Sequence, residues 1–176
     1  SGRVFTTAMT APQTFTIFAF DETSGQELWR RDLDTGPLPP ITTPNSHASS
    51  TPVADDQRVV VYFSTLGLLA LEAQTGEPLW RVPLDVPQYL MDWGAASSPI
   101  IFEDLVILDQ DDDLAPFLIA VDKNSGDVRW RTERPEMLAG YAVPVICEVG
   151  GRKDIVIAGS GKLKGYDPAT GDERWT

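Results

Sequence analysis

Three aspartates at alternating positions are the sharpest chemical feature of the sequence. Asp109, Asp111 and Asp113 lie in the run Asp-Gln-Asp-Asp-Asp, directly after a short apolar stretch that predicts a strand. Their spacing resembles the opening of a calcium loop, because a hard cation takes several carboxylate oxygens from one tight turn. However, Leu114 and Ala120 stand where an EF-hand has its glycine and its last glutamate. Calcium binding therefore stays open, and a solvated acidic loop is the favoured interpretation.

The only histidine and four serines form a second group of candidates. His47 precedes a predicted inner strand, where it would lie near the mouth of the channel predicted below and could contact a ligand or exchange a proton. Because no second ligand or placed carboxylate accompanies it, a structural role is favoured. The serines beside the inner-strand prolines could bind a polar ligand or simply cap strand starts. They are Ser49, Ser50, Ser97 and Ser98.

Two single side chains are predicted to be buried. Cys147 is the only cysteine, so an internal disulfide is excluded, and its apolar run Val143–Cys147 predicts a buried strand position. Trp93 lies in a segment between repeats, where burial is favoured over surface recognition. The sequence shows no spacing typical of a Ser-His-Asp triad, a phosphate loop or a zinc site.

The overall composition narrows the class of partner. The 176 residues carry a formal net charge of −12, which argues against nucleic acid and against an anionic membrane surface, because both attract basic faces. The apolar runs are far shorter than the roughly twenty residues that a spanning helix needs. We therefore expect no membrane insertion, and a partner that is a protein or a small polar ligand.

The elements that must position these residues come from an internal repeat. Four segments align without gaps on the pattern Asp/Glu-x-x-Ser/Thr-Gly-x-x-x-Trp, at a period near fifty residues. The acid can accept hydrogen bonds from backbone amides, the glycine supplies a positive φ that closes a hairpin, and the tryptophan can pack on the next repeat. The glycine and tryptophan positions are Gly25, Trp29, Gly76, Trp80, Gly126, Trp130, Gly171 and Trp175.

Short apolar runs upstream of each turn complete the repeat as four strands. Pro52, Pro99 and Pro144 recur in the first strand of a unit, which suits an inner edge strand lining a central channel. Such units predict an all-β fold, a β-propeller of four-stranded antiparallel blades. The predicted blade segments within the single partial propeller 1–176 are 1–33, 47–84, 94–134 and 139–176.

With this signature, the chain resembles the PQQ-like repeat propellers, also called the quinoprotein alcohol dehydrogenase-like superfamily. Members typically close with eight blades, so the resemblance implies about half a ring here, with three complete or nearly complete blades and one partial blade that lacks its inner strand. We expect either a longer native protein or self-association of two half rings. The resemblance also implies a periplasmic, cell-surface or secreted location.

The family contains quinone-dependent dehydrogenases and noncatalytic relatives. The resemblance implies that a dehydrogenase would need PQQ stacked on a tryptophan, a calcium ion, an aspartate base and often a disulfide between adjacent cysteines. One cysteine cannot form that disulfide, and the repeat tryptophans are assigned to blade packing. We therefore expect a noncatalytic scaffold with no cofactor, and the alternative is a fragment of a PQQ-dependent oxidoreductase.

Overall fold

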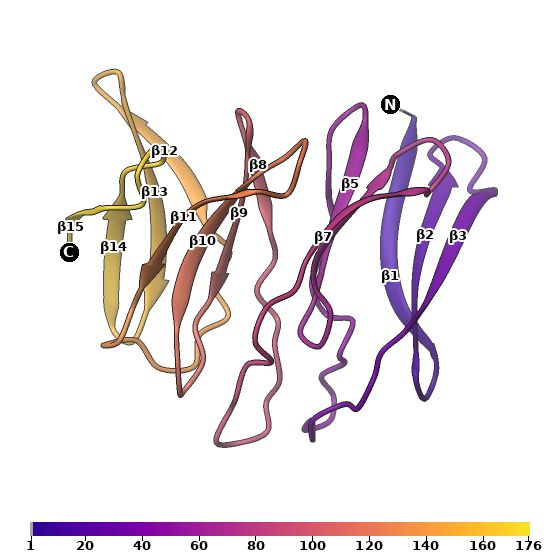
Figure 1. Ribbon diagram of the computed structural model, residues 1–176, viewed down its shortest axis with the longest axis horizontal. Coiled ribbons are helices and arrows are strands. Elements are labelled where there is room, and N and C mark those ends of the chain that lie inside the picture. Colours follow the sequence, from indigo (N-terminus) through magenta and orange to yellow (C-terminus); the bar gives the residue numbers. More distant parts are fainter. Residues whose placement is uncertain (1) are drawn as a thin grey trace.

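Four antiparallel sheets follow one another along the chain in the computed structural model, which describes residues 2–176 (Figure 1). The first sheet has three strands, β1 (Arg3–Ala11), β2 (Thr14–Asp21) and β3 (Glu27–Asp34). It lacks an inner strand, as the sequence predicts for the first repeat. None of the described residues lies in a helix, and among them there is no helix that could cross a membrane.

The other three sheets each contain four strands in sequence order. This confirms the predicted blade architecture, in which consecutive strands pair as hairpins. The second sheet comprises β4 (Val53–Ala54), β5 (Arg58–Phe63), β6 (Gly67–Glu72) and β7 (Pro78–Val82); the third β8 (Ile100–Phe102), β9 (Leu105–Gln110), β10 (Phe117–Asp122) and β11 (Val128–Glu133); the fourth β12 (Val145–Val149), β13 (Arg152–Gly159), β14 (Lys162–Tyr166) and β15 (Glu173–Trp175).

The inner strands are shorter than the sequence predicts. Pro52, Pro99 and Pro144 each lie immediately before the inner strand of their sheet rather than within it. Proline has no N–H to donate to a β-ladder, so pairing begins at the residue that follows it.

The repeated turns have the predicted geometry. In the first, Asp21 Oδ1 accepts hydrogen bonds from the Thr23 amide (3.1 Å) and the Ser24 amide (2.7 Å). Gly25, Gly76, Gly126 and Gly171 have φ between +69° and +79°, a region that glycine enters without steric cost. The strand register shifts after the alanine or glycine that pairs with the repeat tryptophan, so each hairpin carries the same irregularity.

Each of the first three repeat tryptophans packs on the turn of the following sheet. Trp29 Nε1 donates to the Ala73 carbonyl (3.1 Å), and a Cβ placed on Gly76 would lie only 2.7 Å from the Trp29 ring. Trp80 and Trp130 repeat this arrangement on the turns that contain Gly126 and Gly171. Glycine is therefore required at these turn positions for two reasons: it adopts the positive φ, and its lack of a Cβ leaves room for the indole.

Trp175, in the last sheet, packs differently from the other three. Its ring lies on Gly165 of the same sheet, and its Nε1 donates to Asp154 Oδ2 (2.9 Å). The prediction that all four repeat indoles pack on a neighbouring sheet is thus confirmed for three of them.

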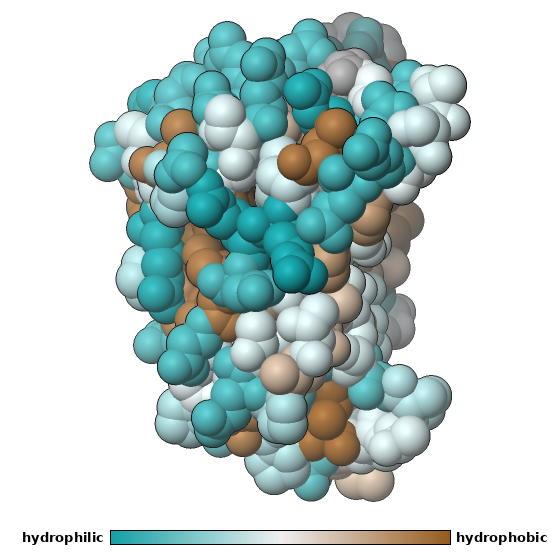
Figure 2. Space-filling view, turned by 90° about the vertical axis from the view of Figure 1, so that its right-hand side faces the viewer, coloured by the Kyte–Doolittle hydropathy of each residue, from teal (hydrophilic) through white to brown (hydrophobic). Residues whose placement is uncertain are grey.

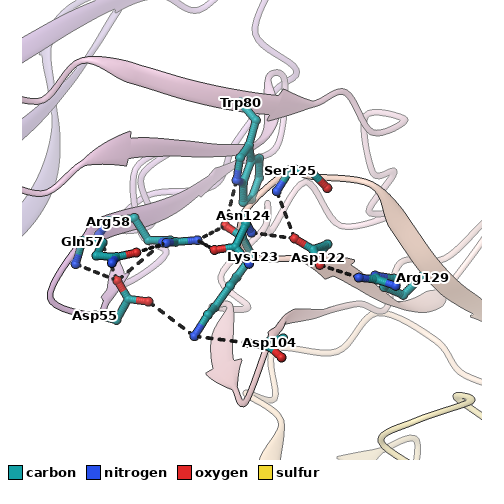
Figure 3. Close-up of polar contacts among 10 residues, drawn as sticks. All are labelled: Asp55, Gln57, Arg58, Trp80, Asp104, Asp122, Lys123, Asn124, Ser125 and Arg129. Atoms are coloured by element: carbon teal, nitrogen blue, oxygen red, sulfur yellow. Dashed lines mark hydrogen bonds and ion pairs between the residues drawn. The ribbon is translucent and has the colours of Figure 1, made fainter.

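A buried arginine reinforces the joint between the second and third sheets (Figure 3). Arg58 is 5% exposed, and its Nη1 donates to the Lys123 carbonyl (2.5 Å) and to Asn124 Oδ1 (2.7 Å). In the same turn, a hydrogen bond from Arg129 lowers the pKa of Asp122 to about 2. This network links the second and third sheets at the edge of the molecule that carries the repeated turns, opposite to the connections between sheets.

Apolar clusters fill the spaces between adjacent sheets. Phe15 and Phe63 stack with ring centroids 4.1 Å apart between the first two sheets. Between the second and third sheets, the buried Tyr62 hydroxyl donates to Gln110 Oε1 (2.7 Å). Ile107 and Ile155 belong to the cluster between the third and fourth sheets. Adjacent sheets thus bury the faces that they turn toward each other, as propeller blades do.

The two end sheets of the stack present one open face each. Figure 2 views the first sheet, where separate hydrophobic patches lie in a mostly hydrophilic surface, and Val4 and Leu28 are exposed. On the last sheet, Cys147 is exposed, contrary to the predicted burial. Ile146 packs toward the third sheet, and because side chains alternate along a strand, Cys147 points the other way.

Candidate functional site

The connections between successive sheets lie along one edge of the molecule, the lower edge in Figure 1. We define the linker face as segments 35–52, 83–99 and 134–144 together with the β9–β10 loop 111–116. Many of the exposed large apolar side chains of the described residues come from these segments, whereas the repeated turns lie at the opposite edge. They are Val86, Leu90, Met91, Trp93, Leu114, Leu138, Tyr141 and Val143.

His47 lies in the wall of a cavity on this face, here called the histidine pocket. The cavity has a volume of about 350 Å³ and lies between the 35–52 and 83–99 linkers, and its lining includes Pro40, Gln88, Tyr89 and Asp92. Burial lowers the pKa of His47, and a hydrogen bond with the Pro39 backbone opposes this only in part. The imidazole is therefore neutral at neutral pH and can act as a polar contact for a small ligand.

Three of the four predicted serines tie together the segments that precede the inner strands. The Ser50 hydroxyl donates to the Ser97 carbonyl (2.6 Å), and the Ser97 hydroxyl donates to the Ala142 carbonyl (2.8 Å). Ser98 Oγ accepts a hydrogen bond from the Thr51 amide (2.9 Å). The exposed Ser49 hydroxyl donates within its own turn, to the Ser46 carbonyl (2.7 Å). Their role as ligand contacts stays a prediction, and this geometry favours the structural alternative.

Three aromatic rings form a second feature, which we call the aromatic shelf. Tyr89 and Tyr141 stack at 5.9 Å between ring centroids, and Trp93 meets Tyr141 at 6.4 Å with an interplanar angle of 53°. Trp93 is 50% exposed, so its predicted burial under the linker is wrong. Its indole finds no hydrophobic cluster to enter, because the linker that carries it runs along the surface of the molecule.

A cavity of about 500 Å³ adjoins the shelf. Trp93 and Tyr141 form one side, and Ala96 and the segment Thr42–Asn45 complete the lining. Asn45 Nδ2 donates to the Trp93 carbonyl (2.5 Å), and the Thr42 amide donates to the Asp92 carbonyl (2.6 Å). These bonds hold the two linkers together, so the cavity is built by residues about fifty positions apart.

The acidic run lies under this face, and much of it is buried. Asp109 and Asp111 are 0% exposed and Asp112 is 4% exposed, so the expected solvated loop is wrong. Asp109 also belongs to β9, which extends to Gln110. Asp111 and Asp112 gain hydrogen bonds from the protein in exchange for water, which is the condition for burying a polar group.

Two carboxylates of the acidic run, those of Asp112 and Asp113, accept hydrogen bonds from backbone amides of the linkers. Asp112 Oδ2 accepts from the Gln88 amide (3.0 Å). Asp113 accepts from the Leu90 amide (2.9 Å) and from the Ala139 amide (3.2 Å). The run thereby connects the 83–99 and 134–144 linkers, which carry all three rings of the aromatic shelf.

Arg134 contacts the buried end of the acidic run, and no local motif in the sequence points to this contact. Its Nε and Nη2 each lie 2.8 Å from an oxygen of Asp111, and its Nη1 donates to the Tyr166 hydroxyl. Arg134 Nε is also 3.3 Å from Asp109 Oδ1. Burial and the neighbouring Asp111 raise the pKa of the Asp109 carboxyl well above its usual range. One guanidinium therefore serves two carboxyl groups, because Arg134 contacts both Asp111 and Asp109.

These residues do not fit a quinone and calcium site. Among residues 2–176, no three His, Cys, Asp or Glu side chains are grouped to hold a metal ion, and Asp109 and Asp111 face Arg134. The packed tryptophans have their rings against glycine turns. PQQ is a tricarboxylate, whereas the linker face contains no basic residue other than the buried Arg134. Calcium binding at Asp109, Asp111 and Asp113 stays a prediction, which this geometry disfavours.

Comparisons with known proteins agree on the architecture. Residues 13–176 match the family described as outer membrane protein assembly factor BamB. The quinoprotein ethanol dehydrogenase of Pseudomonas aeruginosa is 32% identical over 144 residues, covering 72% of this chain and 22% of that protein. The chain thus spans about a fifth of the length of that relative.

Solved structures give the same result for the fold. The quinohemoprotein alcohol dehydrogenase ADHIIG of Pseudomonas putida HK5 aligns with a TM-score of 0.66 at 15% identity, over 99% of this chain and 32% of that one. BamB of Moraxella catarrhalis aligns with a TM-score of 0.61 at 16% identity, over 91% of this chain and 47% of that one. Both share the arrangement of successive sheets seen here.

Proposed function

Because this chain belongs to the PQQ-like repeat propeller family of the outer membrane protein assembly factor BamB, we propose that it is a noncatalytic scaffold that binds a protein or a small polar ligand. The linker face is the proposed binding surface. Functional groups on propellers and similar folds tend to lie on loops that a rigid framework holds in place, and the family itself includes both assembly factors and enzymes.

The observation that carries this proposal is the concentration of exposed apolar side chains on the linker face. Leu90 is 85% exposed, Met91 63% and Leu138 62%, on loops whose backbones are fixed by Asp112 and Asp113. Large exposed apolar residues that gather on one surface mark interaction sites, whereas single ones are ordinary. The two cavities on the same face offer room for side chains of a partner or for a small ligand.

The chemistry of the face also supports binding rather than catalysis. The only histidine has a lowered pKa caused by burial, and the only cysteine lies on the outer face of the last sheet. The name of the matched family, an outer membrane assembly factor, supports a protein partner and a location outside the cytoplasm.

The test is retention of a partner from an extract of the extracytoplasmic fraction. We expect a protein retained by the immobilised chain to be lost when Leu90 and Met91 are both replaced by Asp. Leu79→Asp is the matched control, because Leu79 is 49% exposed but lies on β7, outside the linker face. Equal retention by both variants would refute the linker face as the binding surface.

The alternative is that the chain is a fragment of a quinone-dependent dehydrogenase. The 32% identity to a quinoprotein ethanol dehydrogenase supports this alternative. Titration of the full-length protein with PQQ and Ca²⁺ separates the two. A bound-quinone absorbance together with dye-linked alcohol oxidation would overturn the scaffold proposal.

A further inference from the structure

We propose that the aromatic shelf binds a cationic side chain of the partner, an arginine. This inference rests on the proposed function and specifies the chemistry of the ligand. The shelf consists of Tyr89, Trp93 and Tyr141, and it borders the 500 Å³ cavity whose lining also includes Thr42–Asn45.

The geometry of the shelf suits a planar cation. Trp93 is 50% exposed and Tyr141 is 37% exposed, so ring surface of both residues is open to a ligand. A guanidinium stacks well on such π-surfaces, and indole gives the strongest attraction among the aromatic side chains. The cavity lining also includes the hydroxyl groups of Thr42 and Thr43, and a threonine hydroxyl can accept a hydrogen bond from an N–H donor at the edge of a bound guanidinium.

The charge around the shelf favours a cation over an anion or an apolar group. Segments 35–52 and 83–99 contain no lysine or arginine, while Asp85 and Asp92 lie in the second of them. The phenol of Tyr141 has a raised pKa, caused by burial and by Asp113. Burial, Tyr141 and Asp112 raise the pKa of the Tyr89 phenol. Burial is the larger cause of both shifts, and Asp113 and Asp112 add negative charge near Tyr141 and Tyr89 respectively.

Among the residues that the structure describes, none supplies this cation to the shelf. Arg134, the one basic residue of segment 134–144, is 1% exposed and bound to Asp111. The cation–π contacts found within residues 2–176 use Phe117, Tyr166 and Phe102 instead. The net charge of −12 would further attract a basic segment from solution.

The experiment measures binding of three short fluorescent peptides to the full chain by anisotropy. The peptides differ at one central residue, which is arginine, its neutral isostere citrulline, or norleucine. We expect the arginine peptide to bind about tenfold more tightly than the other two. Equal binding of arginine and citrulline peptides would overturn the inference, and so would no binding of the arginine peptide at millimolar concentration.

Two variants locate the site. Trp93→Leu keeps an apolar side chain at a half-exposed position and should weaken arginine-peptide binding roughly fivefold, without affecting the norleucine peptide. Asp92→Asn removes one charge, and asparagine tolerates the positive φ of 52° at this position. It should weaken arginine binding at low salt, with a smaller effect at high salt. The matched control is Asp104→Asn at the opposite edge, where the aspartate side chain is 82% exposed.

The two proposals fail in different ways. If arginine and norleucine peptides bind equally, the shelf is an apolar docking surface and the cation inference is refuted, while the scaffold proposal stands. If Leu90→Asp with Met91→Asp leaves retention of the partner unchanged, the linker face itself is wrong. An equal loss of binding for all three peptides in the Trp93→Leu variant would also refute the cation inference.

Discussion

Arg134 and Asp111 form a buried, two-pronged ion pair, in which Nε and Nη2 each lie 2.8 Å from a carboxylate oxygen. The pair joins the loop after β9 to the linker after β11, and both partners are almost fully buried. Asp109 lies beside it with no hydrogen-bond donor of its own. Because this ion pair connects the loop after β9 to the linker after β11, we expect changes in its charges to alter the stability of the linker face.

Replacing Arg134 with methionine should destabilise the protein strongly. Methionine fills part of the space but leaves the buried Asp109 and Asp111 carboxyl groups without a cation. Removing one partner of a buried ion pair costs about 3–5 kcal/mol. Urea unfolding measures this loss, and Arg131→Met is the control, because Arg131 pairs with Glu133 in a more exposed position. A loss below about 1 kcal/mol in Arg134→Met would contradict the assigned role.

Asp109→Asn should change how stability depends on pH. The pKa of Asp109 is raised in the folded protein, so the native state binds its proton more tightly than the unfolded chain does. The stabilisation from this proton is complete below the unfolded pKa and is lost as pH rises through the folded pKa. Thermal unfolding between pH 4 and 9 should therefore show wild-type stability falling more steeply than that of the variant. Parallel curves would show that Asp109 is not the group responsible.

Gly76→Ala should destabilise the protein more than Gly25→Ala does. Both glycines have nearly the same φ, +71° and +69°, so the backbone penalty of about 1–2 kcal/mol is shared. Only Gly76 is covered by an indole, and an added Cβ would meet Trp29 at 2.7 Å, whereas Gly25 has nothing within 4 Å. We expect an additional loss of about 1–3 kcal/mol for Gly76→Ala in urea unfolding. Equal losses would mean that the indole moves aside freely.

Self-association through the outer face of the last sheet is the fourth prediction. Val145 is 58% exposed, Val149 79% and Leu163 51%, all on that sheet. An apolar surface of this kind favours association between copies. Light scattering should give a mass above the 19.3 kDa of one chain, rising with concentration. Val149→Asp should return the mass to a single chain, and labelling of the exposed Cys147 should slow as wild-type protein associates.

The repeat could be predicted because its contacts use the same residues in every unit. The glycine that closes the turn also contacts the indole of the preceding unit. One motif therefore specifies both the turn and the packing between adjacent sheets. The absent inner strand of the first sheet was likewise visible in the sequence.

The contacts that build the linker face could not be predicted, because they join residues far apart in the chain. Asp111 and Arg134 are separated by 23 positions, and Asn45 and Trp93 by 48. A run of aspartates looks like a solvated loop when the buried arginine that neutralises it is unknown. Cys147 was misplaced for a related reason, since its apolar run does not say which face of the strand meets the third sheet.

The placement of Trp29 on the turn of the sheet that follows it gives the array a polarity. At each of the three contacts between adjacent sheets, one sheet contributes the indole and the following sheet contributes the glycine turn. A substitution at one contact therefore weakens the packing of one pair of sheets and leaves the other pairs unchanged. Evolution can therefore alter the loops of one unit to suit a new target without retuning the rest of the chain.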